Sequence, residues 1–139
     1  MVQLFNKFMQ YYFEKGFIVR AEALKVYFKN TRAEGTDYEV RRLFAVSGRV
    51  NMLEVFSVTT VYARMPWAAK VRLLMYIFDF DGNKALSRDE LAFLFRALAN
   101  GLSRVNGEEP PSESAVLETA TQTFDVIDKN PDNRLTVEE

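Results

Sequence analysis

The sequence contains no cysteine and no histidine among its 139 residues. The absence of cysteine excludes disulfide bonds, thiolate metal sites and cysteine nucleophiles. The absence of histidine excludes the usual zinc ligand sets, the serine–histidine catalytic pair and the commonest general base. Phosphate-binding glycine loops are also missing. We therefore expect no enzymatic activity, and a metal site in this chain would have to be built from oxygen ligands.

An excess of charge of one sign is also lacking. The chain has 18 basic and 19 acidic side chains and a net charge of −1, so no overall field favours nucleic acid or an anionic membrane. The longest apolar run, residues 73–78, is too short to span a membrane. The N-terminus lacks the basic-then-apolar layout of a signal peptide. We expect a cytoplasmic protein that binds no nucleic acid and has no membrane span.

Apolar side chains recur at helical spacing through most of the chain, whereas strand signals are weak. The expected helical segments include residues 37–45, 52–63, 71–78, 91–98 and 115–127. Residues 101–114 contain two Pro and two Gly without periodicity, and they predict a connector that begins at Gly101. The sequence therefore predicts an all-α fold.

Residues 79–90, DFDGNKALSRDE, place many oxygen donors directly after an apolar helix. Ca²⁺ requires six to eight hard oxygen ligands, which a loop of twelve residues supplies from positions one, three, five, seven, nine and twelve. The seventh ligand is a backbone carbonyl, and the twelfth is a bidentate Glu. The residues at these positions are Asp79, Asp81, Asn83, Ala85, Ser87 and Glu90, and Leu86 is the apolar eighth residue.

Residues 128–139, DKNPDNRLTVEE, repeat the pattern after a second apolar segment. The residues at the same positions are Asp128, Asn130, Asp132, Arg134, Thr136 and Glu139, with Leu135 at position eight. One such match could also be a turn followed by a helix N-terminus, because Asp, Gly and Ser favour both. Two matches at every ligand position favour two Ca²⁺ sites, and the same loops would accept Mg²⁺.

The sixth residue of such a loop lies in a left-handed turn, where Gly is preferred. Lys84 and Asn133 occupy this position. Asn tolerates the left-handed conformation, whereas Lys costs about 1–2 kcal/mol and brings a positive charge near the ion. The sequence therefore predicts that the affinity of the first loop is reduced.

Two further segments match the template at positions six, eight and twelve only. They are residues 11–22, YYFEKGFIVRAE, and residues 43–54, LFAVSGRVNMLE. At the first, third and fifth positions of both segments, only Ser47 offers a ligand-like oxygen. We expect two degenerate loops that bind no ion.

With these four segments, the chain resembles the EF-hand superfamily of helix–loop–helix calcium-binding proteins. The resemblance covers nearly the whole chain and is most specific in residues 79–90 and 128–139. The passages VNMLEVFSVTT and AAKVRLLMYIFDFDGN, with the long connector, are similar to neuronal calcium sensors and to the calaxin-like proteins of cilia. The chain departs from the neuronal sensors because it lacks their Cys-Pro in the first hand and their N-terminal Gly for myristoylation.

The resemblance implies an all-α fold of two paired lobes, residues 1–65 and 66–139, with short two-residue β-ribbons between paired loops. The eighth residues of paired loops would meet: Ile18 with Val50, and Leu86 with Leu135. The chain stops at Glu139, before the exiting helix of the fourth hand. We therefore expect a truncated fourth hand, which favours the alternative of a regulatory module of a larger protein.

The resemblance also implies a calcium sensor that opens an apolar groove for an amphipathic helix of a target protein. The candidate groove residues are Trp67, Met75, Phe78, Leu91, Phe93, Leu94, Phe95 and Leu98, although stripes of this kind more often form a core. Two alternatives stay open: a regulatory domain of a larger enzyme or carrier, and a ciliary or flagellar motor-associated subunit. A passive calcium buffer is disfavoured because two degenerate loops would add no capacity.

Overall fold

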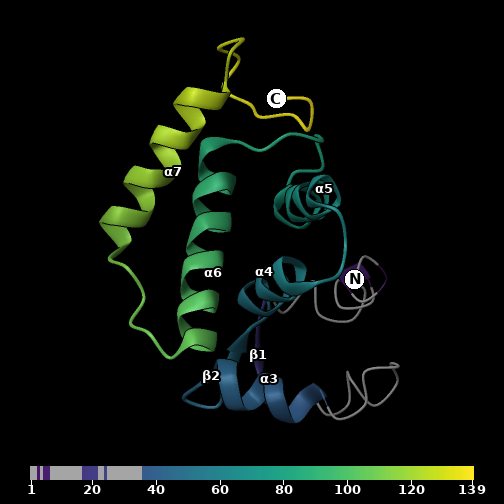
Figure 1. The fold of residues 1–139 in the computed structure, drawn as a ribbon, viewed down its shortest axis with the longest axis vertical. Helices are drawn as coiled ribbons and strands as arrows, with labels where there is room; N and C mark the ends of the chain where they lie inside the picture. Colours follow the sequence, from purple (N-terminus) through teal and green to yellow (C-terminus); the bar gives the residue numbers. More distant parts are fainter. Residues whose placement is uncertain (1–2, 4, 7–16, 22–23, 25–35) are drawn as a thin grey trace. The chain divides into compact units, whose positions relative to one another are not determined.

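The computed structural model describes residues 3, 5–6, 17–21, 24 and 36–139, and these residues are mainly helical, as predicted (Figure 1). Most of the degenerate loop expected at 11–22 lies outside them. Contacts divide the chain into two compact units, Met1–Phe56 and Ser57–Glu139, so the division falls inside helix α4 rather than after residue 65. None of the described helices combines the length and the apolar character that a membrane span requires.

The first unit contains helix α3 (Thr36–Phe44) and a three-stranded antiparallel sheet in the order β1-β3-β2. Its strands are β1 (Ile18–Arg20), β2 (Ala45–Val46) and β3 (Arg49–Asn51). Strands β2 and β3 form a hairpin whose turn residues, Ser47 and Gly48, have φ values of 50° and 72°. Two consecutive left-handed residues match the twist of a hairpin. Residues 43–54 therefore contain a β-hairpin, although the sequence showed only weak strand signals there.

The register of β1 differs by one residue from the predicted pairing of Ile18 with Val50, which is wrong. Val19 lies opposite Val50, and Ile18 lies opposite Asn51. Val19 and Val50 are 6% and 0% exposed, whereas Ile18 is 60% exposed. A slip of one residue exchanges the two faces of a strand. The burial of Val19 therefore decides the register.

Helix α4 (Met52–Tyr62) begins directly after β3. The side-chain oxygen of Asn51 accepts a hydrogen bond from the N–H of Leu53 at 3.1 Å, which caps the helix. Glu54 is buried in the first turn. Near the end of the first unit, the buried rings of Phe5 and Phe56 pack edge to face with centroids 5.2 Å apart.

In the second unit, helices α5 (Trp67–Phe78), α6 (Arg88–Asn106) and α7 (Glu113–Ile127) form the scaffold, with α6 and α7 side by side (Figure 1). Phe78 and Phe124 are fully buried. Phe78 is the last residue of α5, and Phe124 lies in the last turn of α7. The core of this unit is thus anchored directly before each of the two acidic loops.

Helix α6 is longer than the sequence predicted, so the connector expected at residues 101–114 is wrong. Gly101 is buried within the helix, which continues to Asn106 and ends at Gly107 with φ 71°. Leu102 and Val105 extend the helical spacing of the apolar stripe, and a left-handed Gly commonly ends a helix. The connector is therefore residues 107–112, after which Ser112 caps α7 by accepting the N–H of Ala115 at 3.2 Å.

Replacing Gly48 with Ala should destabilise the first unit by about 1–2 kcal/mol because a Cβ disfavours its left-handed conformation. No atom lies within 4 Å of the added Cβ, so a clash would not contribute. Ser47→Gly is the matched control and should be nearly neutral, since relief of the same strain offsets the flexibility of Gly in the unfolded chain. Chemical denaturation followed by circular dichroism measures both. Equal losses in the two variants would contradict this account of the turn.

Candidate metal sites

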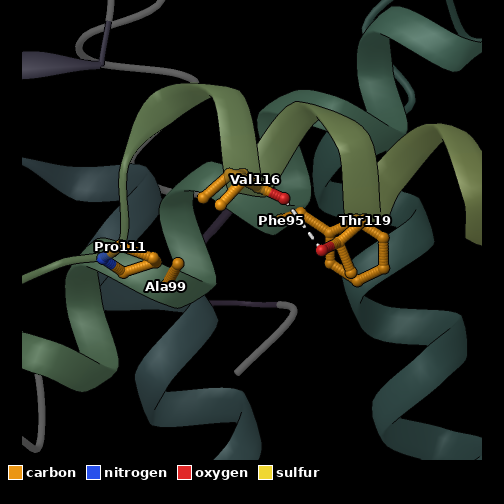
Figure 2. Close-up of a pocket in the computed structure, with 6 residues that line it drawn as sticks. Phe95, Ala99, Pro111, Val116 and Thr119 are labelled. Atoms are coloured by element: carbon orange, nitrogen blue, oxygen red, sulfur yellow. Dashed lines mark hydrogen bonds between the residues drawn. The ribbon is translucent and has the colours of Figure 1, made fainter.

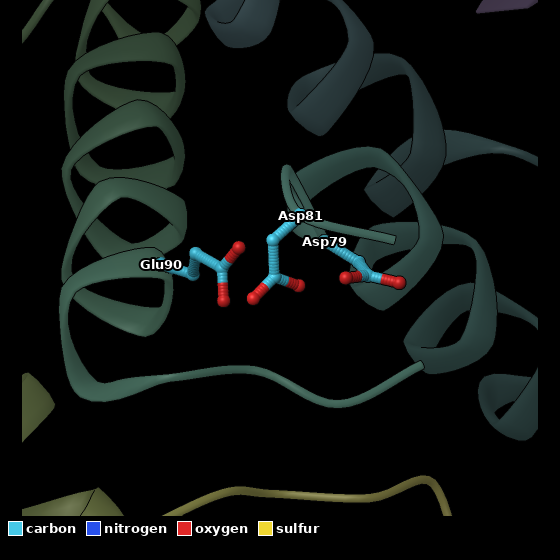
Figure 3. A group of neighbouring side chains, drawn as sticks. All are labelled: Asp79, Asp81 and Glu90. Atoms are coloured by element: carbon cyan, nitrogen blue, oxygen red, sulfur yellow. The ribbon is translucent and has the colours of Figure 1, made fainter. Parts of the chain in front are cut away.

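Three carboxylates lie close together in residues 79–90, which join α5 to α6 (Figure 3). One oxygen from each of Asp79, Asp81 and Glu90 lies within 4.8 Å of the others. Asp79 and Asp81 come from the loop, whereas Glu90 lies in the first turn of α6 and is 7% exposed. Like charges at this separation repel one another, so a cation between them would stabilise the loop.

Backbone N–H groups orient the ligand side chains of this loop. Asp79 accepts the N–H of Asn83 at Oδ1 (3.0 Å) and the N–H of Lys84 at Oδ2 (2.9 Å). Asn83 in turn accepts the N–H of Ala85 at Oδ1 (2.9 Å) and donates its side-chain amide to Asp81 Oδ2 (2.7 Å). Each of these oxygens has a second lone pair. The side chains are therefore held in place while they retain the capacity to coordinate an ion.

Glu90 joins the two ends of the first loop. Its Oε1 accepts the N–H of Phe80 at 2.8 Å, and its Oε2 accepts the N–H and the hydroxyl of Ser87 at 2.9 and 2.8 Å. Ser87 Oγ accepts the N–H of Glu90 at 3.3 Å, which completes a capping box. One carboxylate thus connects the start of the loop to the start of α6.

The second loop, residues 128–139, repeats several of the hydrogen bonds of the first. In both loops the backbone N–H of residue six donates to the side chain of residue one, and the backbone N–H of residue seven donates to the side chain of residue five. The backbone N–H and the hydroxyl of residue nine both donate to the carboxylate of residue twelve. In the second loop these are Asn133 N–H to Asp128 Oδ2 (3.2 Å), Arg134 N–H to Asp132 Oδ1 (2.9 Å), and Thr136 N–H and hydroxyl to Glu139 Oε2 (2.9 and 3.2 Å). Asn130, at position three, accepts the N–H of Asp132 at 3.3 Å.

The two loops are joined at their eighth residues. The N–H of Leu86 donates to the carbonyl of Leu135 at 2.8 Å, and the N–H of Leu135 donates to the carbonyl of Leu86 at 2.9 Å. Both side chains are buried. This is the pairing that the sequence predicted for these two residues.

The backbone at position six also matches the prediction. Lys84 and Asn133 have φ values of 67° and 61°, so both lie in the left-handed region. The loops differ at position four, where Gly82 has φ 72° and the second loop has Pro131. The ring of Pro fixes φ near −65°, so the second loop must follow another path at this point.

One carboxylate oxygen of the second loop has no hydrogen-bonding partner among the residues that the structure describes. Asp128 Oδ1 is buried and accepts no hydrogen bond from any described residue. Burying such an oxygen without compensation costs free energy. Asp128 is the first ligand position, where coordination of a cation would supply the missing partner. Asp128, Asp132 and Glu139, all of which the structure describes, are not drawn together as closely as the three acids of the first loop.

Sequence comparisons add no family assignment to this geometry. A scan against models of known protein families gives no match, and a search of curated proteins gives none. The residues of the two loops offer carboxylate, amide, hydroxyl and carbonyl oxygens, and this donor set fits a hard cation that prefers oxygen ligands.

The side chains proposed for a target groove do not share one environment. Phe78, Leu91 and Leu94 are buried, and in this conformation they cannot contact a partner. Trp67 and Phe93 are exposed, whereas Met75, Phe95 and Leu98 are half-buried.

An apolar pocket of about 200 Å³ lies between α6 and α7, and Phe95 is the candidate groove residue that lines it (Figure 2). Its lining residues are Phe95, Ala99, Pro111, Ala115, Val116 and Thr119. A second pocket, of about 170 Å³, lies beside the first loop and is lined in part by Met75, Asp79, Lys84 and Val137.

Sequence analysis assigned no role to Arg88, which belongs to the first loop but contacts the helix that enters the second. Its guanidinium carbon lies 4.4 Å from the centroid of the Phe124 ring, and Nη2 lies 2.5 Å from Asp125 Oδ1. No sequence signal distinguishes this arginine, because a charged residue in the first turn of a helix is ordinarily solvated surface.

Replacing Lys84 with Gly should stabilise the second unit by about 0.5–1 kcal/mol, because relief of the left-handed strain exceeds the entropic cost of Gly. Asn133→Gly is the matched control at the same position of the other loop and should be nearly neutral, since Asn tolerates this conformation. Urea denaturation in the presence of a chelator measures both variants. A destabilised Lys84→Gly protein would show that Lys84 makes compensating contacts.

Proposed function

We propose that the second unit is a calcium-binding module of the EF-hand type, in which residues 79–90 and 128–139 each bind one Ca²⁺. The observation that carries this proposal is the repetition of the same hydrogen bonds at the same loop positions. An isolated turn before a helix would account for the capping box of Ser87 and Glu90. It would not account for the bonds between positions six and one, which recur in both loops.

The donor set supports a hard cation. Carboxylate, amide, hydroxyl and carbonyl oxygens meet the preference of Ca²⁺ for six to eight flexible oxygen ligands. Mg²⁺ requires a tighter octahedral arrangement and would compete for the same residues. We infer an affinity in the sensor range, about 10⁻⁷–10⁻⁵ M. The buried Oδ1 of Asp128, which accepts no hydrogen bond from a described residue, is consistent with this assignment.

Glu90 is the residue through which binding would change the conformation. Its carboxylate accepts three hydrogen bonds, from Phe80 and Ser87, and it stands at the start of α6. As a bidentate ligand it would turn toward the centre of the loop, and the first turn of α6 would move with it. Leu91 and Leu94 lie on the same helix and are buried. Their exposure would create an apolar surface for an amphipathic helix.

This mechanism suits a cytoplasmic calcium sensor that acts on a target protein. It would equally suit a regulatory domain of a larger protein, because the response depends only on residues of the second unit. We propose no ion for residues 43–54, where Ala45–Val46 and Arg49–Asn51 form strands instead of presenting ligands.

Calorimetric titration with Ca²⁺ over a background of excess Mg²⁺ should show two bound ions. Glu90→Gln and Glu139→Gln should each lose one ion, because Gln cannot act as a bidentate anionic ligand. Asp89→Asn and Glu138→Gln are the matched controls, since each removes the same charge from the adjacent position, and both should retain two ions. Unchanged stoichiometry in both ligand variants would refute the site assignment.

Fluorescence of a hydrophobic dye such as ANS should distinguish a sensor from a buffer. We expect a rise when Ca²⁺ is added, because opening exposes apolar side chains that are now buried. The rise should be lost in Glu90→Gln and retained in Asp89→Asn. A protein that binds two ions without a change in dye fluorescence would be a buffer rather than a sensor.

A further inference from the structure

Arg88 connects the helix that leaves the first loop to the helix that enters the second. It is the first residue of α6, and its guanidinium stacks over Phe124, which is fully buried in the last turn of α7. A cation at 4.4 Å from a ring centroid is within the range of a cation–π interaction. The ion pair with Asp125 contributes less, because both side chains are about half exposed.

The turn that Arg88 contacts also positions the first ligand of the second loop. The carbonyl of Phe124 accepts the N–H of Asp128 at 2.8 Å, which ends α7. Asp128 Oδ1 is then buried, and its Oδ2 accepts the N–H of Asn133. The location of the Asp128 carboxylate therefore depends on where the last turn of α7 lies.

We propose that Arg88, although it belongs to the first loop, is a positioning residue for the ion site of the second loop. Its guanidinium holds the last turn of α7, and with it the Asp128 carboxylate, in the geometry that a bound cation requires. This inference rests on the proposed function, since it assumes that residues 128–139 bind Ca²⁺.

Electrostatics alone predicts the opposite effect of removing Arg88. Loss of a positive charge near a cation site, together with release of the Asp125 carboxylate, would raise the affinity of the site. A positioning role predicts a lower affinity. The sign of the change therefore separates the two explanations.

The test is the affinity of each loop measured alone by calorimetric Ca²⁺ titration of the full chain. In a Glu90→Gln background, which isolates the second loop, Arg88→Gln should weaken Ca²⁺ binding roughly fivefold, as loss of a partly buried cation–π contact implies. In a Glu139→Gln background, which isolates the first loop, Arg88→Gln should not weaken Ca²⁺ binding, because none of its contacts with Phe124 and Asp125 reaches a ligand of that loop.

Arg96 provides a matched control. It lies on the same helix, stacks over Phe93 at 5.7 Å and bonds to Glu113, the first residue of α7. Arg96→Gln thus removes a cation–π contact within α6 and an ion pair between α6 and α7, at the end of α7 remote from Asp128. It should leave the affinity of the second loop unchanged. Equal weakening by the two variants would show that general packing of α7 matters, and would overturn the proposal.

Hydrogen exchange in the presence of a chelator gives a second readout that needs no ion. The Asp128 amide should lose protection in Arg88→Gln but retain it in Arg96→Gln, because only the former loosens the last turn of α7. If the Asp89→Asn protein binds one ion and the Glu90→Gln protein binds none, the second loop is not a site and the proposed function fails with the inference. If it binds Ca²⁺ equally well with and without Arg88, or if exchange at Asp128 is unchanged, only the inference fails.

Discussion

The pair of hydrogen bonds between Leu86 and Leu135 is the constraint on which the second unit depends. These bonds fix two loops that are far apart in the sequence in a single relative position. The buried side chains of the same two leucines attach the loops to the core. The bridge involves only the backbone of the eighth residues, so the candidate ligand side chains of both loops are oriented by hydrogen bonds within each loop. The separation of an apolar anchor from polar ligands explains how a small core supports two acidic loops.

This arrangement brings negatively charged carboxylates close together, and their mutual repulsion destabilises the loops. The first loop holds the carboxylates of Asp79, Asp81 and Glu90 close together, and the second buries one oxygen of Asp128 without a partner among the described residues. Backbone N–H groups compensate this charge only in part, since each N–H carries a small dipole. A bound cation would complete the compensation. The same loops would then stabilise the fold and respond to the ion concentration.

Helix α6 shows why the two acidic loops could be predicted more reliably than the helix boundaries. The candidate ligand positions follow from local spacing, and Lys84 and Asn133 have the left-handed conformation expected at position six. Gly101 signalled a helix end, but the helix buries this residue and ends at Gly107. A glycine near the end of a helix has two uses, as a cap or as a small residue in a packed interface, and only tertiary contacts choose between them.

The sequence by itself determined the helical character and the spacing of the candidate ligands, because these features depend on short-range chemistry. The pairing of Leu86 with Leu135 joins residues distant in the chain, and it was expected only from the resemblance of the two acidic loops to paired helix–loop–helix hands. Tertiary structure alone decided that Val19 rather than Ile18 faces the core, since both are β-branched apolar residues with equal strand propensity. It also decided that Arg88 stacks on Phe124. That contact joins residues distant in the chain, and no local pattern specifies which surface arginine will meet a buried ring.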